Sequence, residues 1–210
     1  MAEVKKLIEG YKSFYQKNFV ENNGDAFKKL QTSQKPKTLI ISCSDSRVDP
    51  AILTNADVGD IFVIRNVANL VPPYQPMGDS SHGTSAAIEF AVDYLKVKHI
   101  VIMGHSNCGG VKALIDNDIE ADNNFSFITN WISLAKNVKN EIPKDLDHDE
   151  KCCFCEKEVI KISLKNLMTF PFVQKRVATQ ELKLHGWYFS IKDGSLAVFD
   201  EATEAFTKIN

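Results

Sequence analysis

Two short stretches of the sequence bring together side chains that could bind a metal ion. In the first, CSDSR, Cys43 closes an apolar run and is followed by Asp45 and Arg47. In the second, GHSNCGG, His105 and Cys108 lie three residues apart at the end of another apolar run. Two thiolates and one imidazole form a three-ligand zinc set with one position free. Such an open position is typical of catalytic zinc sites, whereas structural sites are usually closed by four protein ligands.

Each part of this pattern also has a simpler explanation. A lone buried cysteine usually behaves as a small hydrophobic side chain, and an isolated H-x-x-C is a weak signal. Asp45 and Arg47 could form an ion pair that caps the end of a strand. Other thiol chemistry fits less well, because a phosphatase-type loop needs a longer spacing between cysteine and arginine than the three residues found here. The nucleoside deaminase signature, H-x-E with P-C-x-x-C, is absent, and no G-x-G-x-x-G follows a strand.

Three apolar runs predict the strands that would position these residues. TLIIS, DIFVIRN and KHIVIMGH occupy residues 38–42, 60–66 and 98–105. They read as interior strands of a parallel sheet, in which both faces are buried and alternation disappears. A helical pattern at 82–97 separates the second run from the third, which gives the strand–helix–strand order of α/β proteins.

The order of these strands decides whether the candidate ligands can meet. In open α/β sheets, ligands gather at the carboxyl ends of strands where the chain order reverses. If the first and third strands are neighbours, with the second on the other side of the first, then Cys43, His105 and Cys108 converge at that edge.

The remaining elements follow from apolar spacing and turn residues. Further helices are predicted at residues 4–19, 25–30, from 108 onward, and at 126–138, 156–167 and 173–182. The tail HGWYFSIKDGSLAVFD predicts two strands joined by a turn at 192–194. No repeat or linker interrupts the chain, so we expect one domain over residues 1–210. The apolar stripe of the first helix needs a cover, and we expect residues 1–33 to form a helical arm that packs on a partner subunit.

Composition narrows the class of protein. The chain has 210 residues, of which 44% are hydrophobic, and a formal net charge of −2. This near-neutral charge and the lack of a basic block argue against a nucleic-acid partner. No signal-peptide pattern and no apolar run of membrane-spanning length is found, so we expect no membrane partner and a cytoplasmic location. Five cysteines without a secretion signal argue against a disulfide framework.

A cluster of three cysteines, Cys152, Cys153 and Cys155, raises the question of a second metal site. Only His148 is close enough in sequence to complete it. The charged flanks indicate an exposed helix start, so we interpret these residues as incidental thiols or as a redox-sensitive patch. His82 precedes a predicted helix, where it is either a solvated surface residue or a proton shuttle at the mouth of a cleft.

The two chemistry-bearing motifs, taken together at this separation, resemble the β-class carbonic anhydrases in their plant-like subgroup. The resemblance covers about residues 35–114 and 159–196, and RNVANLVPPY, AIEFAV and GHSNCGG all look like segments of that family. It implies a mostly parallel central sheet of about four strands with an antiparallel edge strand, flanked by helices. It also implies self-association as a dimer or a larger assembly, with a tetramer possible.

The resemblance assigns roles to particular residues. It implies one Zn²⁺ per subunit, held by Cys43, His105 and Cys108, and a catalytic dyad of Asp45 and Arg47. It further implies substrate contacts in the cleft. These are Gln34, which would reach the site of the neighbouring subunit, the apolar wall residues Phe62 and Val67, and Phe90, which stands where plant-like members often have a tyrosine.

The implied activity is the reversible hydration of carbon dioxide to bicarbonate and a proton. In that mechanism Asp45 accepts a hydrogen bond from zinc-bound hydroxide and aims it at carbon dioxide, and Arg47 keeps Asp45 ionised. Two alternatives remain at this stage. The same fold and ligands can support hydrolysis of carbon disulfide or carbonyl sulfide, and the chain could instead be a non-catalytic zinc-binding sensor protein.

Overall fold

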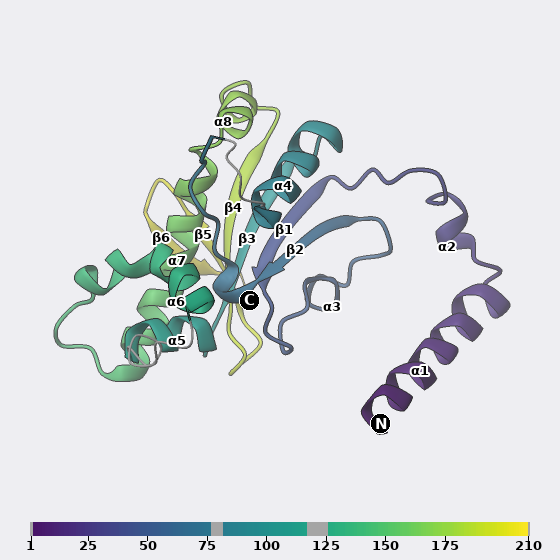
Figure 1. Ribbon diagram of the computed structural model, residues 1–210, viewed down its shortest axis with the longest axis horizontal. Helices are drawn as coiled ribbons and strands as arrows, with labels where there is room; N and C mark the ends of the chain where they lie inside the picture. Colours follow the sequence, from purple (N-terminus) through teal and green to yellow (C-terminus); the bar gives the residue numbers. More distant parts are fainter. Residues whose placement is uncertain (1, 77–81, 117–125, 210) are drawn as a thin grey trace.

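The fold is built on one mixed sheet of six strands, in the order β2-β1-β3-β4-β5-β6 (Figure 1). The computed structural model describes residues 2–76, 82–116 and 126–209. The strands are β1 (Thr38–Cys43), β2 (Ile61–Asn66), β3 (His99–His105), β4 (Lys183–Phe189), β5 (Leu196–Asp200) and β6 (Ala205–Lys208). The first four are parallel, and β5 and β6 are antiparallel additions at one side. This confirms the α/β fold and the order of the first three strands expected from the sequence.

Helices cover the sheet and fill the crossovers between its strands. Those that precede the third strand are α1 (Ala2–Tyr15), η1 (Gln16–Glu21), α2 (Asp25–Lys28), α3 (Pro50–Thr54), η2 (Val67–Asn69), α4 (Gly83–Glu89) and η3 (Phe90–Tyr94). Those that follow it are α5 (Gly109–Asp116), α6 (Ser126–Ile132), η4 (Ser133–Glu141), α7 (His148–Leu167) and α8 (Pro171–Ala178). Within the described residues, no helix is both long enough and apolar enough to cross a membrane.

Several elements differ from the sequence prediction, among them the short helix α3, which was not predicted, and α8, which begins at Pro171 and ends at Ala178 instead of spanning 173–182. Helix α7 begins at His148 rather than near residue 156, because Asp147 and Glu150 form a capping box that satisfies the first free amides of the helix. The three cysteines of this region therefore lie inside a helix and not at an exposed start. Strand β6 was not predicted, since it is short and its residues are largely exposed.

The core lies mainly between one face of the sheet and the helices α4, α7 and α8. Leu39, Ile41, Ile100 and Ile102 point to this face and are fully buried. Helix α7 packs across β3 and β4, where Gly104 leaves room for the side chain of Ile160. This close approach brings α7 against the strand that ends at His105.

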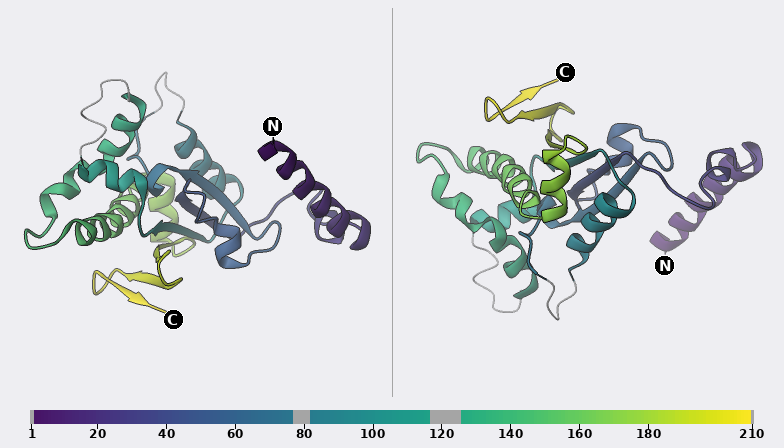
Figure 2. Two further views of the ribbon diagram at one scale, coloured as in Figure 1. Left: turned by 90° about the horizontal axis from the view of Figure 1, so that it is seen from below. Right: turned by 90° about the horizontal axis from the view of Figure 1, so that it is seen from above.

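The amino-terminal elements α1, η1 and α2 form an arm that extends away from the sheet (Figures 1 and 2). Its aromatic rings pack on one another, with Phe19 and Phe27 stacked 4.9 Å apart between centroids. The apolar stripe of the arm is exposed in this chain, and none of the residues of α1 is buried. Its exposed apolar residues are Val4, Leu7, Ile8, Tyr11, Phe14, Tyr15, Phe19 and Val20.

We predict that Gly104→Ala destabilises the fold by about 1–3 kcal/mol through overpacking. A β-carbon on Gly104 would lie 2.8 Å from Cδ1 of Ile160, which is itself buried. Urea unfolding measures the change. Gly83→Ala is the matched control, because nothing lies within 4 Å of a β-carbon at that position. Equal stabilities for the two variants would contradict the close approach of α7 to β3.

Candidate metal centre

The carboxyl ends of β1 and β3 bring the three candidate ligands together. Cys43 ends β1, His105 ends β3, and Cys108 lies in the turn that leads into α5. Their ligand atoms all lie within 4.8 Å of one another, and all three residues are buried. The two sulfur atoms are 3.9 Å apart. Two sulfur ligands of a tetrahedral zinc ion, each about 2.3 Å from the metal, lie about 3.8 Å apart, so the spacing fits such an ion.

The imidazole of His105 is oriented for metal binding. Its Nδ1 lies 2.9 Å from the carbonyl oxygen of Ser106, a bond that requires a proton on Nδ1 and leaves a lone pair on Nε2. Nε2 is buried and has no hydrogen-bond partner of standard geometry within the described part of the chain. A buried nitrogen without a partner is costly, and a metal ion in contact with the two thiols would satisfy it.

The two thiols influence each other's protonation. Their hydrogen bond lowers the pKa of Cys43, where it acts against the opposing effect of burial, and it raises the pKa of Cys108. Hydrogen bonds from the backbone amides of Val111 and Gly110, in the first turn of α5, act in the opposite direction and lower the pKa of Cys108. A divalent cation would stabilise both thiolates together, since metal ligation by cysteine requires the deprotonated sulfur.

Asp45 and Arg47 form a two-bond ion pair at the rim of this site. Nη2 of Arg47 donates to Oδ2 of Asp45 at 2.6 Å, and Nε donates to Oδ1 at 2.9 Å. The backbone amide of Arg47 also donates to Oδ1. These bonds to Arg47 hold the pKa of Asp45 well below its usual range, so its carboxylate stays ionised at neutral pH. Oδ2 of Asp45 lies 4.0 Å from Nε2 of His105, which places the carboxylate beside the candidate ligands.

Arg65, which the sequence did not single out, binds the backbone of the loop that contains Cys43 and Asp45. Its Nε donates to the carbonyl oxygen of Cys43 at 3.1 Å, and its Nη2 donates to the carbonyl oxygen of Asp45 at 2.7 Å. Its Nη1 pairs with Asp49. The sequence did offer a signal for this role. Arg65 is the one charged residue within the apolar run of β2, and a charge in a buried strand needs hydrogen-bond partners nearby.

The four residues expected to contact substrate are not all brought together by this chain. Val67 packs against the apolar cluster that contains Cys43 and Cys108. Phe62 and Phe90 contact each other, with ring centroids 5.9 Å apart, and Phe62 packs against the separate cluster beneath α4. Gln34 is exposed in the segment between α2 and β1. The predicted substrate contacts of these residues stay predictions.

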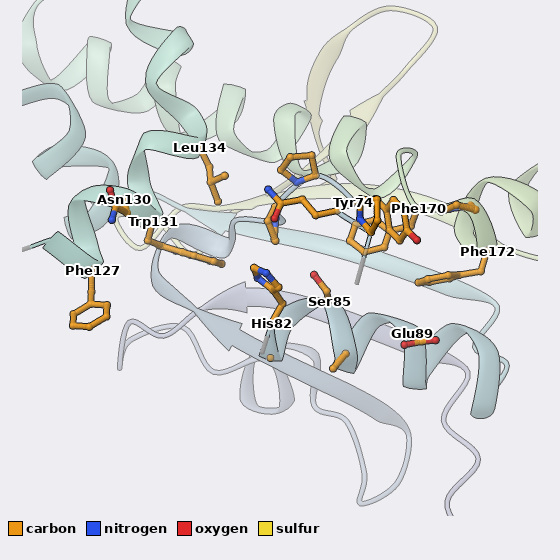
Figure 3. A pocket seen from close by; sticks show the side chains of 17 residues that line it. Tyr74, His82, Ser85, Glu89, Phe127, Asn130, Trp131, Leu134, Phe170 and Phe172 are labelled. Carbon is orange, nitrogen blue, oxygen red and sulfur yellow. The ribbon is translucent and has the colours of Figure 1, made fainter. Parts of the chain in front are cut away.

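A pocket of 990 Å³ is lined by residues of α4, α6 and α8 (Figure 3). Its lining includes His82, Ser85, Trp131 and Phe172, and the side chain of His82 points into it. Nε1 of Trp131 donates to the carbonyl oxygen of Val67 at 2.8 Å, which ties one wall of the pocket to the apolar cluster around the ligands. His82 is an exposed residue, as expected for a solvated surface histidine, and the alternative role in proton transfer stays a prediction.

Among the described residues, the cysteines of α7 belong to no group with metal-binding geometry. The cluster of Cys43, His105 and Cys108 is the only group of metal-binding geometry among the residues that the structure describes. Cys155 is fully buried, and burial raises the pKa of its thiol to about 12, so it cannot belong to an exposed redox patch. Cys152 and Cys153 are half-buried. His148 lies beside Cys152 but binds Asp116, with 2.6 Å between Nε2 and Oδ1.

We predict that Asp116→Asn lowers the pKa of His148 toward its ordinary value, because the bond to Asp116 is the main cause of its raised pKa. A raised pKa stabilises the fold at pH values below the ordinary pKa of histidine, and this contribution is lost as the pH rises through the folded value. NMR titration of the His148 ring measures the shift. Asp149→Asn is the control, since Asp149 is fully exposed and contributes less. Equal shifts in the two variants would contradict the assignment to Asp116.

Comparison with known proteins agrees with the site. Residues 38–196 match the family model described as carbonic anhydrase. The chain is 37% identical over 210 residues to beta carbonic anhydrase 3 of Arabidopsis thaliana, covering 97% of this chain and 80% of that protein.

Solved structures give the same result. The β-carbonic anhydrase CcaA matches all of this chain and 93% of its own, with a TM-score of 0.91 and 31% identity. A tetrameric β-carbonic anhydrase from Sordaria macrospora matches with a TM-score of 0.79 and 27% identity, covering 100% of this chain and 98% of that one. Together with the fold and the Cys-His-Cys cluster, these matches show that the chain belongs to the β-class carbonic anhydrases, a family of lyases.

Proposed function

We propose that this chain catalyses the reversible hydration of carbon dioxide to bicarbonate and a proton, as a zinc enzyme with one ion per subunit. The observation that carries the proposal is a buried cluster of two thiols and an unpartnered imidazole nitrogen, with an ionised carboxylate at its rim. Cys43, His105 and Cys108 would hold the ion. When bound, zinc supplies a Lewis acid that lowers the pKa of water to about 7.

Asp45 is proposed to orient the attacking water. Because Arg47 keeps it ionised, its carboxylate can accept a hydrogen bond from that water and direct an oxygen lone pair toward carbon dioxide. Arg47 is fixed in turn, since its Nη2 also donates to the carbonyl oxygen of Asn107 at 3.0 Å. The pair is therefore set in position before substrate arrives, which is the condition for efficient electrostatic catalysis.

The apolar surroundings suit a substrate without strong hydrogen-bonding groups. Val67 packs beside the ligand cluster and would form part of the wall that receives carbon dioxide. Gln34, Phe62 and Phe90 are proposed to act across a subunit boundary, because Phe90 and the arm that precedes Gln34 leave apolar surface exposed. Bicarbonate would leave by exchange with water, and the proton would pass to buffer.

Self-association is part of the proposal. The exposed apolar stripe of α1 needs a cover. Strand β2 lies at one edge of the sheet, and no other strand of the described chain pairs with its outer side. A dimer in which the arm of one subunit lies on its neighbour would cover the stripe. The tetrameric structure from Sordaria macrospora supports assembly of this kind. A cytoplasmic location stays a prediction.

We predict that Asp45→Asn lowers the rate of carbon dioxide hydration by about 100-fold or more, because the variant loses its charged acceptor for the water proton. Stopped-flow hydration assays measure the rate, and the zinc content of each sample is determined in parallel. Asp193→Asn is the matched control, since Asp193 also has a lowered pKa but lies in the turn before β5. A zinc-loaded Asp45→Asn variant as fast as the parent would overturn this role for Asp45.

The same assay separates the alternatives. A metal-replete parent that hydrolyses carbon disulfide or carbonyl sulfide, and does not hydrate carbon dioxide, would favour the hydrolase. A parent that does neither would favour the non-catalytic sensor.

We predict that Leu7→Lys shifts the protein toward smaller species in sedimentation velocity, because it places a charge within the exposed apolar stripe of α1. Deletion of residues 2–24 removes the whole stripe and should shift the sedimentation coefficient further toward that of a single chain. Lys6→Ser, on the opposite face of the same helix, is the control and should sediment like the parent. If the deletion variant sediments as the same assembly, the arm does not hold the subunits together.

A further inference from the structure

Glu156 is a buried charged residue that the proposed mechanism does not use. It lies on α7 and is only 3% exposed. Burying a carboxylate costs free energy unless its oxygens are satisfied by hydrogen bonds. We propose that Glu156 is a positioning residue for the metal centre, which fixes the turn that carries Cys108 and, through Asn107, also Arg47. This inference rests on the zinc site of the proposed function.

The carboxylate of Glu156 binds the backbone of a candidate ligand. Its Oε1 accepts the amide N–H of Cys108 at 2.9 Å. Its Oε2 accepts the hydroxyl of Tyr188 at 2.8 Å, and the amide of Asn107 also interacts with the carboxylate. Both oxygens are therefore occupied by donors, which is the arrangement expected of a structural carboxylate with a fixed orientation.

The turn that Glu156 holds has an unfavourable backbone conformation. Asn107 has a φ of 56°, in the left-handed region that costs free energy for residues other than glycine. Such a conformation persists only when the surroundings fix it. Glu156 binds the amide side of the turn, and Arg47 binds the carbonyl oxygen of Asn107 from the other side.

This arrangement links two parts of the centre. On one side of the turn, Glu156 binds the backbone amide of Cys108 and so fixes the position of its thiol. On the other side, the carbonyl oxygen of Asn107 orients Arg47, whose guanidinium holds Asp45. Loss of the carboxylate would therefore disturb a zinc ligand and the Asp45–Arg47 pair together. Partners of metal ligands have this kind of effect, and their loss typically costs about 10–100-fold in metal affinity.

The test compares Glu156→Ala with two milder changes. Glu156→Gln keeps an amide oxygen that can accept the Cys108 N–H. Tyr188→Phe removes the support of Oε2 and leaves the turn itself untouched. Ser163→Ala is the matched control, because Ser163 is also buried on α7 and binds backbone groups of Asn69 and Val71, away from the turn. Zinc affinity is measured by competition with a chelator, and the geometry of the ligands by the visible absorption spectrum of the cobalt-substituted protein.

We expect Glu156→Ala to lower zinc affinity by about 10–100-fold and to shift the cobalt bands. Glu156→Gln should restore most of the affinity, and Tyr188→Phe should fall between the two. Ser163→Ala should lower stability and leave both readouts unchanged. If Glu156→Ala does not fold, the ranking of Glu156→Gln, Tyr188→Phe and the parent decides the question.

Three outcomes would overturn the inference. The first is parent-like affinity and spectrum in Glu156→Ala, or in Tyr188→Phe where Glu156→Ala does not fold. The second is an equal spectral shift in Ser163→Ala. Either would leave the proposed function intact, because the parent would still bind metal. The third is a parent that binds neither zinc nor cobalt, which would overturn the proposed function and this role with it.

Discussion

The site depends on the close approach of two buried sulfur atoms and one buried imidazole nitrogen. Thiolates that lie 3.9 Å apart repel each other, and burial adds a desolvation cost to each charge. Without a cation, one proton shared by the two thiols limits the repulsion, which is why the pKa values of Cys43 and Cys108 move in opposite directions. A divalent ion removes the conflict, because it stabilises both thiolates and satisfies Nε2 of His105. The protein thus folds into a site whose unfavourable interactions a metal relieves.

The surrounding residues hold this site from several directions. Arg65 binds the backbone of the Cys43–Asp45 loop, and Arg47 links that loop to the turn at Asn107. Glu156 holds the same turn from α7. The ligands come from the ends of β1 and β3 and from the turn after β3, so their relative position depends on these bonds as much as on the sheet. Helix α7 can reach the site because Gly104 lets Ile160 pack against β3.

The sequence predicted the strands and the candidate ligands because both leave local signals. The runs around Ile41 and Ile102 are long enough to identify buried parallel strands, and Cys43 and His105 stand at their ends. The start of α7 was missed, since its first turns are polar and lack an apolar period, although Asp147 and Glu150 were a usable capping signal. Strand β6 is too short and exposed to leave a pattern.

The supporting residues could not be predicted in the same way. A glutamate within a charged helix, such as Glu156, looks solvated until tertiary packing buries it against the turn at Cys108. Gln34 presents a different limit, because its expected role involves a second subunit that no pattern within one chain can place.

The most direct measurement is zinc K-edge X-ray absorption of the purified protein, combined with its zinc content. Our interpretation predicts one zinc ion per chain, with two sulfur ligands at about 2.3 Å and the remaining light-atom ligands at about 2.0–2.2 Å. A protein that neither contains nor takes up zinc, or one whose zinc is surrounded by four sulfur atoms, would contradict it.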